Sequence, residues 1–147
     1  MTLADDVRDH HAHCVPHLLR LRILAGHDAA APLPSGIAHE VGDATGVILA
    51  EARAAESAAL AAVAGSRRGS RVARFLAPRL ARLSAAADDA VAAAKSGNVP
   101  ALRRDLRRFD ALTSATWTVQ LAMCAPPKPR RSATAPPRTR RTGVYAR

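Results

Sequence analysis

The sequence predicts an all-α fold: an antiparallel up-down four-helix bundle with a disordered basic C-terminal tail. Three observations lead to this prediction. Alanine dominates the 147 residues and aromatic residues make up only 3%, a composition that favours helices over strands. Residues 1–124 contain four stretches in which apolar residues recur every three or four positions, the period of an amphipathic helix. Short breaks separate the stretches, so consecutive helices should run antiparallel.

The first helix is expected from about Leu3 to Ala25. Thr2 and Asp5 have the spacing of a capping box at its start. Pro16 should kink this helix, because a proline ring clashes with the carbonyl four residues earlier. The predicted inward stripe alternates steps of four and three residues and consists of Leu3, Val7, His10, Cys14, His17, Leu21 and Leu24.

The other three helices follow after short loops. Ser35 should cap the second helix, and Gly65 should end it. The third is expected to begin near Ser70 and to stop at Gly97, and Asn98 should open the fourth. The predicted buried face of the fourth helix consists of Leu102, Leu106, Phe109, Leu112, Trp117 and Leu121.

The net charge of +10 is concentrated at the C-terminus. Seven of the 22 Lys and Arg residues, and no acidic residue, lie between 125 and 147, which leaves residues 1–124 with a net charge of +3. Residues 125–147 are rich in proline and contain almost no large apolar side chains, so we expect a disordered tail beside one bundle domain of residues 1–124.

Location and redox state follow from the same composition. No apolar run approaches the roughly 18 residues of a membrane span. The first residues are acidic, whereas a signal peptide begins with basic residues. We therefore expect a cytoplasmic protein that does not engage a membrane. The two cysteines form neither a CxxC pair nor a disulfide framework, which predicts reduced thiols.

All six histidines lie within the first 39 residues, and four of them crowd one segment of the first helix. Histidine is the commonest side-chain metal ligand. The candidate ligands are His10, His11, His13, Cys14, His17, Glu51 and Glu56. At about 100° per residue, most of the cluster should face the interior, with His11 at the seam with a neighbouring helix. The helical rise of about 1.5 Å per residue places His10 or His11 level with Glu51 and Trp117.

One imidazole and one carboxylate in this layer make a poor metal site, because iron and zinc need at least three good ligands. The first interpretation is therefore a hydrogen-bonded polar cluster in a protein without a cofactor. One alternative is a single iron, copper or zinc ion, bound by the first-helix cluster with His39 or Glu51 as a third ligand. Another is a pH-sensitive structural cluster, because neighbouring imidazoles resist joint protonation.

The segment from His11 to His17 resembles the first-helix motif of hemerythrin-like (HHE) domains, in which a Pro-His pair often follows a ligand histidine. Residues 48–63, 80–84 and 102–117 are similar to the other three helices of that family, so the resemblance spans about residues 5–123. It implies a four-helix bundle, which in that family holds an oxygen-binding di-iron centre. Only His11 matches a ligand of that centre. The resemblance places the remaining ligand positions at Glu51, Ala55, Ala77, Thr116 and Gln120, with Glu56 one position late. It therefore implies the fold without the usual iron chemistry.

Basic residues suggest weak, sequence-independent nucleic-acid binding as a further alternative. The candidate residues are Arg103, Arg104, Arg107 and Arg108 of the fourth helix and Lys128, Arg130, Arg131, Arg138, Arg140 and Arg141 of the tail. A second arginine cluster lies near the start of the third helix, at Arg67, Arg68, Arg71 and Arg74. Aromatic residues that would form a base-stacking platform are missing from the sequence pattern, and solvated helix faces explain the arginines equally well.

Enzyme motifs are absent from the sequence: no nucleophile lies beside a base in a recognisable motif, and there is no glycine-rich phosphate loop. We therefore expect a non-catalytic binding or scaffold protein with an unidentified protein partner.

Overall fold

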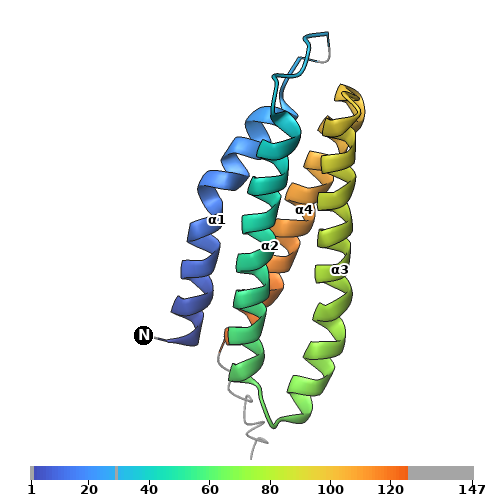
Figure 1. The fold of residues 1–147 in the computed structure, drawn as a ribbon. Coiled ribbons are helices and arrows are strands. Elements are labelled where there is room, and N and C mark those ends of the chain that lie inside the picture. Colours follow the sequence, from blue (N-terminus) through green and yellow to red (C-terminus); the bar gives the residue numbers. More distant parts are fainter. Residues whose placement is uncertain (1, 29, 126–147) are drawn as a thin grey trace, which may run out of the picture.

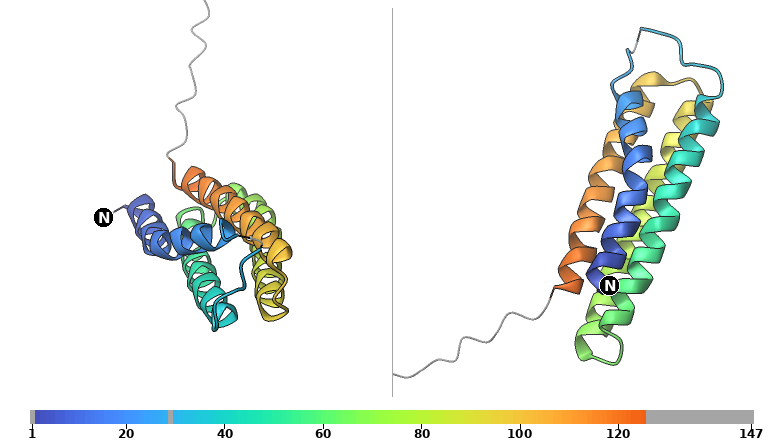
Figure 2. Two further views of the ribbon diagram at one scale, coloured as in Figure 1. Left: turned by 90° about the horizontal axis from the view of Figure 1, so that it is seen from above. Right: turned by 90° about the vertical axis from the view of Figure 1, so that its left-hand side faces the viewer.

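The structure, a computed structural model, describes residues 2–28 and 30–125. This part of the chain contains four helices: α1 (Leu3–Ala25), α2 (Ile37–Ala62), α3 (Arg67–Lys95) and α4 (Val99–Cys124). The helices lie side by side and alternate in direction, so the predicted antiparallel four-helix bundle is confirmed (Figures 1 and 2). The prediction of a disordered tail, with its basic residues from Lys128 to Arg141, lies outside the described residues.

The helices form a ring in which α1 and α3 each contact both α2 and α4. The second and fourth helices also touch each other across the centre, whereas α1 and α3 do not meet among the described residues. The interior is aliphatic and rich in alanine. Its fully buried residues include Ile48, Ala52, Ala55, Ala59, Leu83, Ala86, Ala90 and Phe109. Small side chains of this kind allow neighbouring helices to approach closely. None of the four described helices is long and apolar enough to cross a membrane.

Local sequence sets the start of α1 as predicted. The backbone N–H of Asp5 donates to Oγ1 of Thr2 over 3.2 Å, and the backbone N–H of Thr2 donates to Oδ2 of Asp5 over 2.9 Å. This capping box is confirmed, and its hydrogen bonds lower the pKa of Asp5. The predicted Ser35 cap of α2 is wrong: Gly36, at φ +80°, occupies the N-cap position instead, and no side chain caps the helix.

The ends of α3 and the start of α4 follow the same local chemistry. The third helix begins three residues earlier than predicted, because the Ser66 hydroxyl accepts the backbone N–H of Gly69 over 2.9 Å. Gly97, at φ +69°, follows α3 in the left-handed conformation that glycine adopts readily. Asn98 caps α4, with its Oδ1 accepting from the N–H of Ala101 over 3.0 Å.

The buried face of α1 differs from the predicted stripe. The buried residues are Val7, His11, Cys14, Leu18, Leu21, Leu24 and Ala25. His10 and His17 are only partly buried, and Leu3 is exposed. Relative to Cys14, His11 lies at about +60° and His10 at about −40° on the helix. The helix is therefore turned so that His11, rather than His10, faces the interior. It also bends along its length, as expected from the internal Pro16 (Figures 1 and 2).

The buried face of α4 also departs from the prediction after Phe109. Polar Thr113, Thr116 and Gln120 are buried there, whereas Trp117 is only partly buried. The Thr113 hydroxyl donates to the carbonyl of Phe109 over 2.9 Å, and that of Thr116 donates to the Leu112 carbonyl over 2.8 Å. These bonds satisfy the hydroxyl groups within their own helix, so the buried threonines leave no unpaired donor.

Candidate metal site

A chain of hydrogen bonds crosses the bundle interior at the level of His11. Nε2 of His11 donates to Oε1 of Gln120 over 2.8 Å, and Nε2 of Gln120 donates to the carbonyl of Ala52 over 2.9 Å. The side chains come from α1 and α4 and end on the backbone of α2. His11 is 7% exposed and Gln120 is fully buried. The chain gives a partner to Nε2 of His11 and to both polar atoms of the Gln120 amide, and so fixes the contact between three helices.

The indole of Trp117 covers this layer from α4. Its ring is stacked on the His11 imidazole, with the ring centroids 4.7 Å apart and an angle of 13° between the planes. The Trp117 N–H has no hydrogen-bond partner among the described residues. Burial lowers the pKa of His11, opposed by the Gln120 hydrogen bond and reinforced by neighbouring His10. His11 is therefore a neutral, stacked and hydrogen-bonded core residue.

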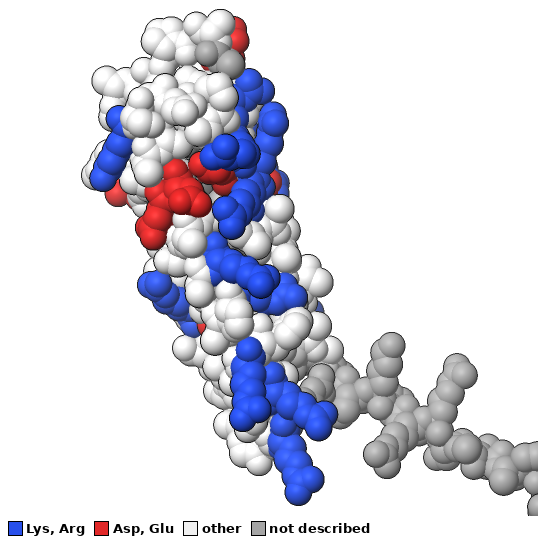
Figure 3. Space-filling model, turned by 90° about the vertical axis from the view of Figure 1, so that its right-hand side faces the viewer, with Lys and Arg blue, Asp and Glu red and all other residues white. Residues whose placement is uncertain are grey.

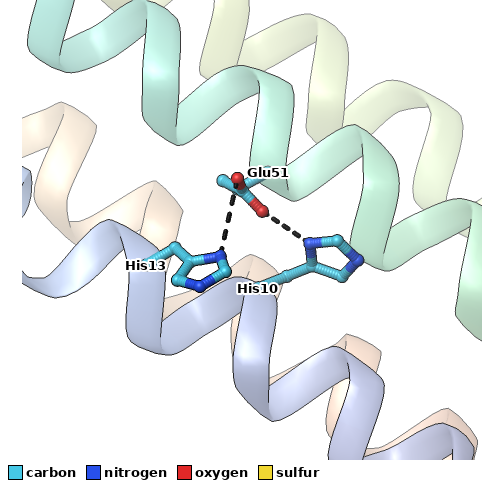
Figure 4. A group of neighbouring side chains, drawn as sticks. All are labelled: His10, His13 and Glu51. Atoms are coloured by element: carbon cyan, nitrogen blue, oxygen red, sulfur yellow. Dashed lines mark hydrogen bonds and ion pairs between the residues drawn. The ribbon is translucent and has the colours of Figure 1, made fainter.

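A second group of polar side chains lies outside the core, between α1 and α2. His10 and His13 project from α1 on either side of the Glu51 carboxylate from α2 (Figure 4). Nδ1 of His10 donates to Oε2 of Glu51 over 2.5 Å, and Nδ1 of His13 lies 3.8 Å from Oε1. In the described part of the chain, this is the group in which three potential ligand atoms, one from each residue, all lie within 4.8 Å of one another.

The geometry suits a metal ion that binds nitrogen and oxygen. Bonds of about 2.0–2.2 Å to a tetrahedral zinc ion place neighbouring ligand atoms roughly 3.3–3.5 Å apart. The observed spacing requires side-chain movements on the order of 1 Å to reach it. The side chains of His10, His13 and Glu51 are 31%, 70% and 25% exposed, so they have the freedom to move and the ion has a path from solvent. Two imidazoles and one carboxylate leave the fourth position to water.

The other predicted ligands lie elsewhere. Cys14 is fully buried, and its Sγ donates to the His10 carbonyl over 3.3 Å. Burial, with Glu51 nearby, raises the pKa of this thiol to about 11, so it does not offer a thiolate at neutral pH. His39 pairs with Asp43 on α2 over 3.1 Å. His17 and Glu56 are partly buried, and neither belongs to the three-ligand group; burial raises the pKa of Glu56.

The predicted polyanion-binding arginines of α4 are mostly engaged by neighbours. Nε of Arg103 donates to the carbonyl of Ala25, and Arg104 donates twice to the buried Asp105 carboxylate. Arg108 lies 3.5 Å from Asp89 on α3. A shallow surface hollow of about 440 Å³ is lined by Pro100, Arg103, Arg104 and Arg107. Since two of the four guanidinium groups, those of Arg104 and Arg108, lie beside a carboxylate, this face carries less free positive charge than the sequence suggests.

The sequence predicted which residues lie at the same height in the bundle, but not which of them face the core and which lie between α1 and α2. Helical rise correctly placed His10 or His11 level with Glu51 and Trp117. The inward position of His11 was missed because the predicted stripe ran through His10 and His17, which placed His11 at the seam with a neighbouring helix. Leu18, seven residues after His11 and on the same side of the helix, is the apolar residue that indicates the true buried face. Gln120 was identified only as a position where the resemblance implies a carboxylate, and nothing in its chemistry distinguished it from a solvated residue.

The chain matches no protein-family model, no curated protein and no solved structure. The resemblance to hemerythrin-like domains therefore stays a prediction. One of its implied ligand positions, Ala77, is exposed on α3, whereas a ligand to a central ion would face the interior.

Proposed function

We propose that this protein is a non-catalytic helical-bundle binding module that takes up one divalent transition-metal ion at His10, His13 and Glu51. The observation that carries the proposal is the convergence of three ligand atoms, from two helices, to within 4.8 Å of one another. Imidazole nitrogen with carboxylate oxygen is a donor set that suits zinc, copper, nickel or iron. Among the interpretations of the histidine cluster, we thus favour the binding of a single metal ion. The proposed ligands are three of the seven candidates that the sequence suggested.

The interior layer supports a non-catalytic role. His11 already donates its Nε2 proton to Gln120 and stacks on Trp117, so a metal ion there would have to break both contacts. Thr116 and Gln120 supply no imidazole or carboxylate in the positions at which the hemerythrin-like resemblance implies ligands. We propose that the chain is a degenerate member of that family, in which the interior ligand layer has been replaced by hydrogen bonds. A scaffold role toward a protein partner remains compatible with this proposal.

Metal binding at the seam would link α1 to α2. His10 and His13 are three residues apart on one helix, whereas Glu51 lies on the other, so a bound ion joins two elements that are otherwise held by packing. An ion that binds the folded chain alone stabilises it by RT ln(1 + [M]/Kd), about 2.7 kcal/mol at a free ion concentration of 100 Kd. A rise in melting temperature with added metal is therefore expected in addition to binding itself.

Isothermal titration of the tag-free full-length chain with Zn²⁺, Ni²⁺ and Cu²⁺ tests the proposal. We expect one site per chain. The variant His10→Ala/His13→Ala should lose this site, and Glu51→Gln, which keeps the shape of the side chain, should weaken it roughly tenfold or more. Far-UV circular dichroism of each variant establishes that the helices are intact.

The matched control is His17→Ala/His39→Ala, which also removes two histidines but leaves the three-ligand group unchanged. It should bind the ion as the parent chain does. Equal binding by the His10/His13 variant and the control would contradict the assignment of the site, and the lack of any stoichiometric binding would contradict the function.

A further inference from the structure

The first half of α3 carries five described arginines on one side and no acidic residue. Residues 67–82 include Arg67, Arg71, Arg74, Arg79 and Arg82. At about 100° per residue, they fall within an arc of roughly 140° on the helix. The opposite side of the helix carries the buried Leu76 and Leu83. We call this outward arc, together with Phe75 at its centre, the α3 basic face.

The charges of the α3 basic face are not neutralised by carboxylates. Among the described residues, none of its five arginines forms an ion pair, whereas Arg104 and Arg108 of α4 do. Figure 3 shows the difference: basic side chains lie without acidic neighbours at the end of the bundle where α3 begins, and acidic and basic side chains lie together nearer the other end.

This arrangement is electrostatically unfavourable for the helix itself. Arg67 and Arg71 are four residues apart, and Arg71 and Arg74 are three apart, spacings at which like charges repel. The first turn of α3 contains no acidic residue, so its basic residues meet the positive end of the helix dipole. A bound polyanion would offset both effects, because phosphate groups are stabilised near helix N-termini and by guanidinium groups.

Phe75 gives the basic face an aromatic centre. It is 55% exposed, and the Arg79 guanidinium lies 4.5 Å from the centroid of its ring. No aromatic platform for base stacking was expected from the sequence, whose pattern did not reveal that Phe75 faces outward. Exposed aromatic rings among arginines are typical of surfaces that stack single-stranded bases and contact the phosphates between them.

We propose that the α3 basic face binds single-stranded nucleic acid without sequence preference. From Arg67 to Arg82 the helix rises about 22 Å. The arginines would contact phosphates, and the ring of Phe75 would stack on one base. This inference does not rest on the metal site, which lies between α1 and α2.

An anionic membrane fits the face less well. Interfacial helices insert a broad apolar side, but Phe75 is the one large apolar residue exposed on α3 in the described part of the chain. The apolar side of α3 is buried against the bundle. Charge complementarity and a single ring thus favour a nucleic-acid strand over a lipid surface.

Fluorescence anisotropy with a labelled 20-nucleotide oligo(dT), measured with the full-length chain between 50 and 300 mM salt, tests the proposal. In the variant Arg71→Gln/Arg74→Gln/Arg82→Gln, three phosphate contacts are lost. The slope of log K against log salt should therefore decrease in magnitude by about 2, at about 0.7 per contact with a single strand. All three side chains are exposed, so the helical content should not change.

The matched control is Arg8→Gln/Arg20→Gln/Arg53→Gln, which removes the same charge from exposed positions on α1 and α2. It should leave the slope within experimental error of the parent value. Equal slopes for the two triple variants would overturn the proposal, because binding would then reflect net charge alone.

Phe75→Leu separates stacking from charge. It should weaken binding to oligo(dT) about fivefold or more, while binding to a duplex of the same length should not change. Unchanged oligo(dT) binding in this variant would overturn the assignment to a single strand. Binding to vesicles of anionic phospholipid, lost in the α3 arginine variant while oligo(dT) binding persists, would assign the face to a membrane instead.

Discussion

The hydrogen-bond chain through His11 and Gln120 can be tested by a double-mutant cycle. Gln120→Leu removes the acceptor for Nε2–H of His11 and leaves that donor buried without a partner. His11→Leu removes the donor and leaves Oε1 of Gln120 unpaired in a fully buried side chain. The double variant replaces both polar groups with apolar ones of similar size. Since an unsatisfied buried group costs more than the loss of a complete pair, the single variants should be disproportionately unstable.

The expected magnitudes follow from the burial of the pair. Each single variant should lower the free energy of unfolding by about 1–3 kcal/mol. His11→Leu should lose up to about 1 kcal/mol more, because its stacking on Trp117 is lost as well. In the double variant the two losses should not add, which gives a coupling energy of about 1–3 kcal/mol. For about 120 ordered residues, 2 kcal/mol corresponds to a shift of roughly 8 °C in Tm.

Urea denaturation of the four proteins, followed by circular dichroism at 222 nm and pH 7.5, provides the free energies. Equal m-values would show that the variants unfold to comparable states. Losses that add to within about 0.5 kcal/mol would refute the argument, because independent sites behave in that way. His11 and Gln120 would then be two separate buried residues rather than one hydrogen-bonded pair.

Three further outcomes follow from single residues. Burial lowers the pKa of His11 from its ordinary value of 6.5, so the unfolded chain binds a proton that the folded chain does not, and stability should fall as pH drops below 6.5. Urea titrations at pH 7.5, 6.5 and 5.5 should show that the free energy of unfolding declines with pH, and that His11→Leu reduces this decline by up to about 1.4 kcal/mol per pH unit. An identical decline in the parent chain and the variant would contradict this prediction. The buried Cys14 thiol, with its pKa raised to about 11, should react with a disulfide reagent only after unfolding, whereas the partly exposed Cys124 reacts first; two thiols titrating at once from folded protein would be inconsistent with the packing. Thr2→Ala should lower the free energy of unfolding by about 1 kcal/mol through loss of the capping box, and Thr2→Ser should retain most of it, as measured by urea denaturation.

Local features of the fold were predictable wherever a residue acts on its own neighbours. The Thr2–Asp5 capping box, the Asn98 cap and the glycine after α3 each depend on fewer than five consecutive residues, and each was predicted from the local residue types and their order. The prediction of a Ser35 cap is wrong because Gly36, which adopts positive φ more readily, lies between Ser35 and the first helical residue. When two neighbouring residues could each cap a helix, the backbone geometry decides between them, and the sequence alone does not give that geometry.

The polar interior was harder to predict, since it contradicts the pattern from which the faces were assigned. Thr113, Thr116 and Gln120 lie where apolar residues would continue the buried stripe of α4, whereas the predicted stripe continued through Leu112 and Trp117. Buried threonines are tolerated because they bond to their own helix, and a buried glutamine requires partners from two other helices. Such partners become known only when the register of all three helices is known.

One rotation of α1 about its axis explains two features: the burial of His11 in the core, and the position of His10 and His13 beside Glu51. Measured around the helix from His11, His10 lies about 100° away and His13 about 160° away in the same direction. When His11 turns toward α4, the other two therefore turn together toward Glu51 on α2. The rotation is fixed by Leu18 and Leu21, which are buried on either side of the helical face centre and do not depend on the histidines. Removal of His10 and His13 should consequently leave the rotation unchanged, so that a loss of metal binding in that variant reports on the ligands and not on the fold.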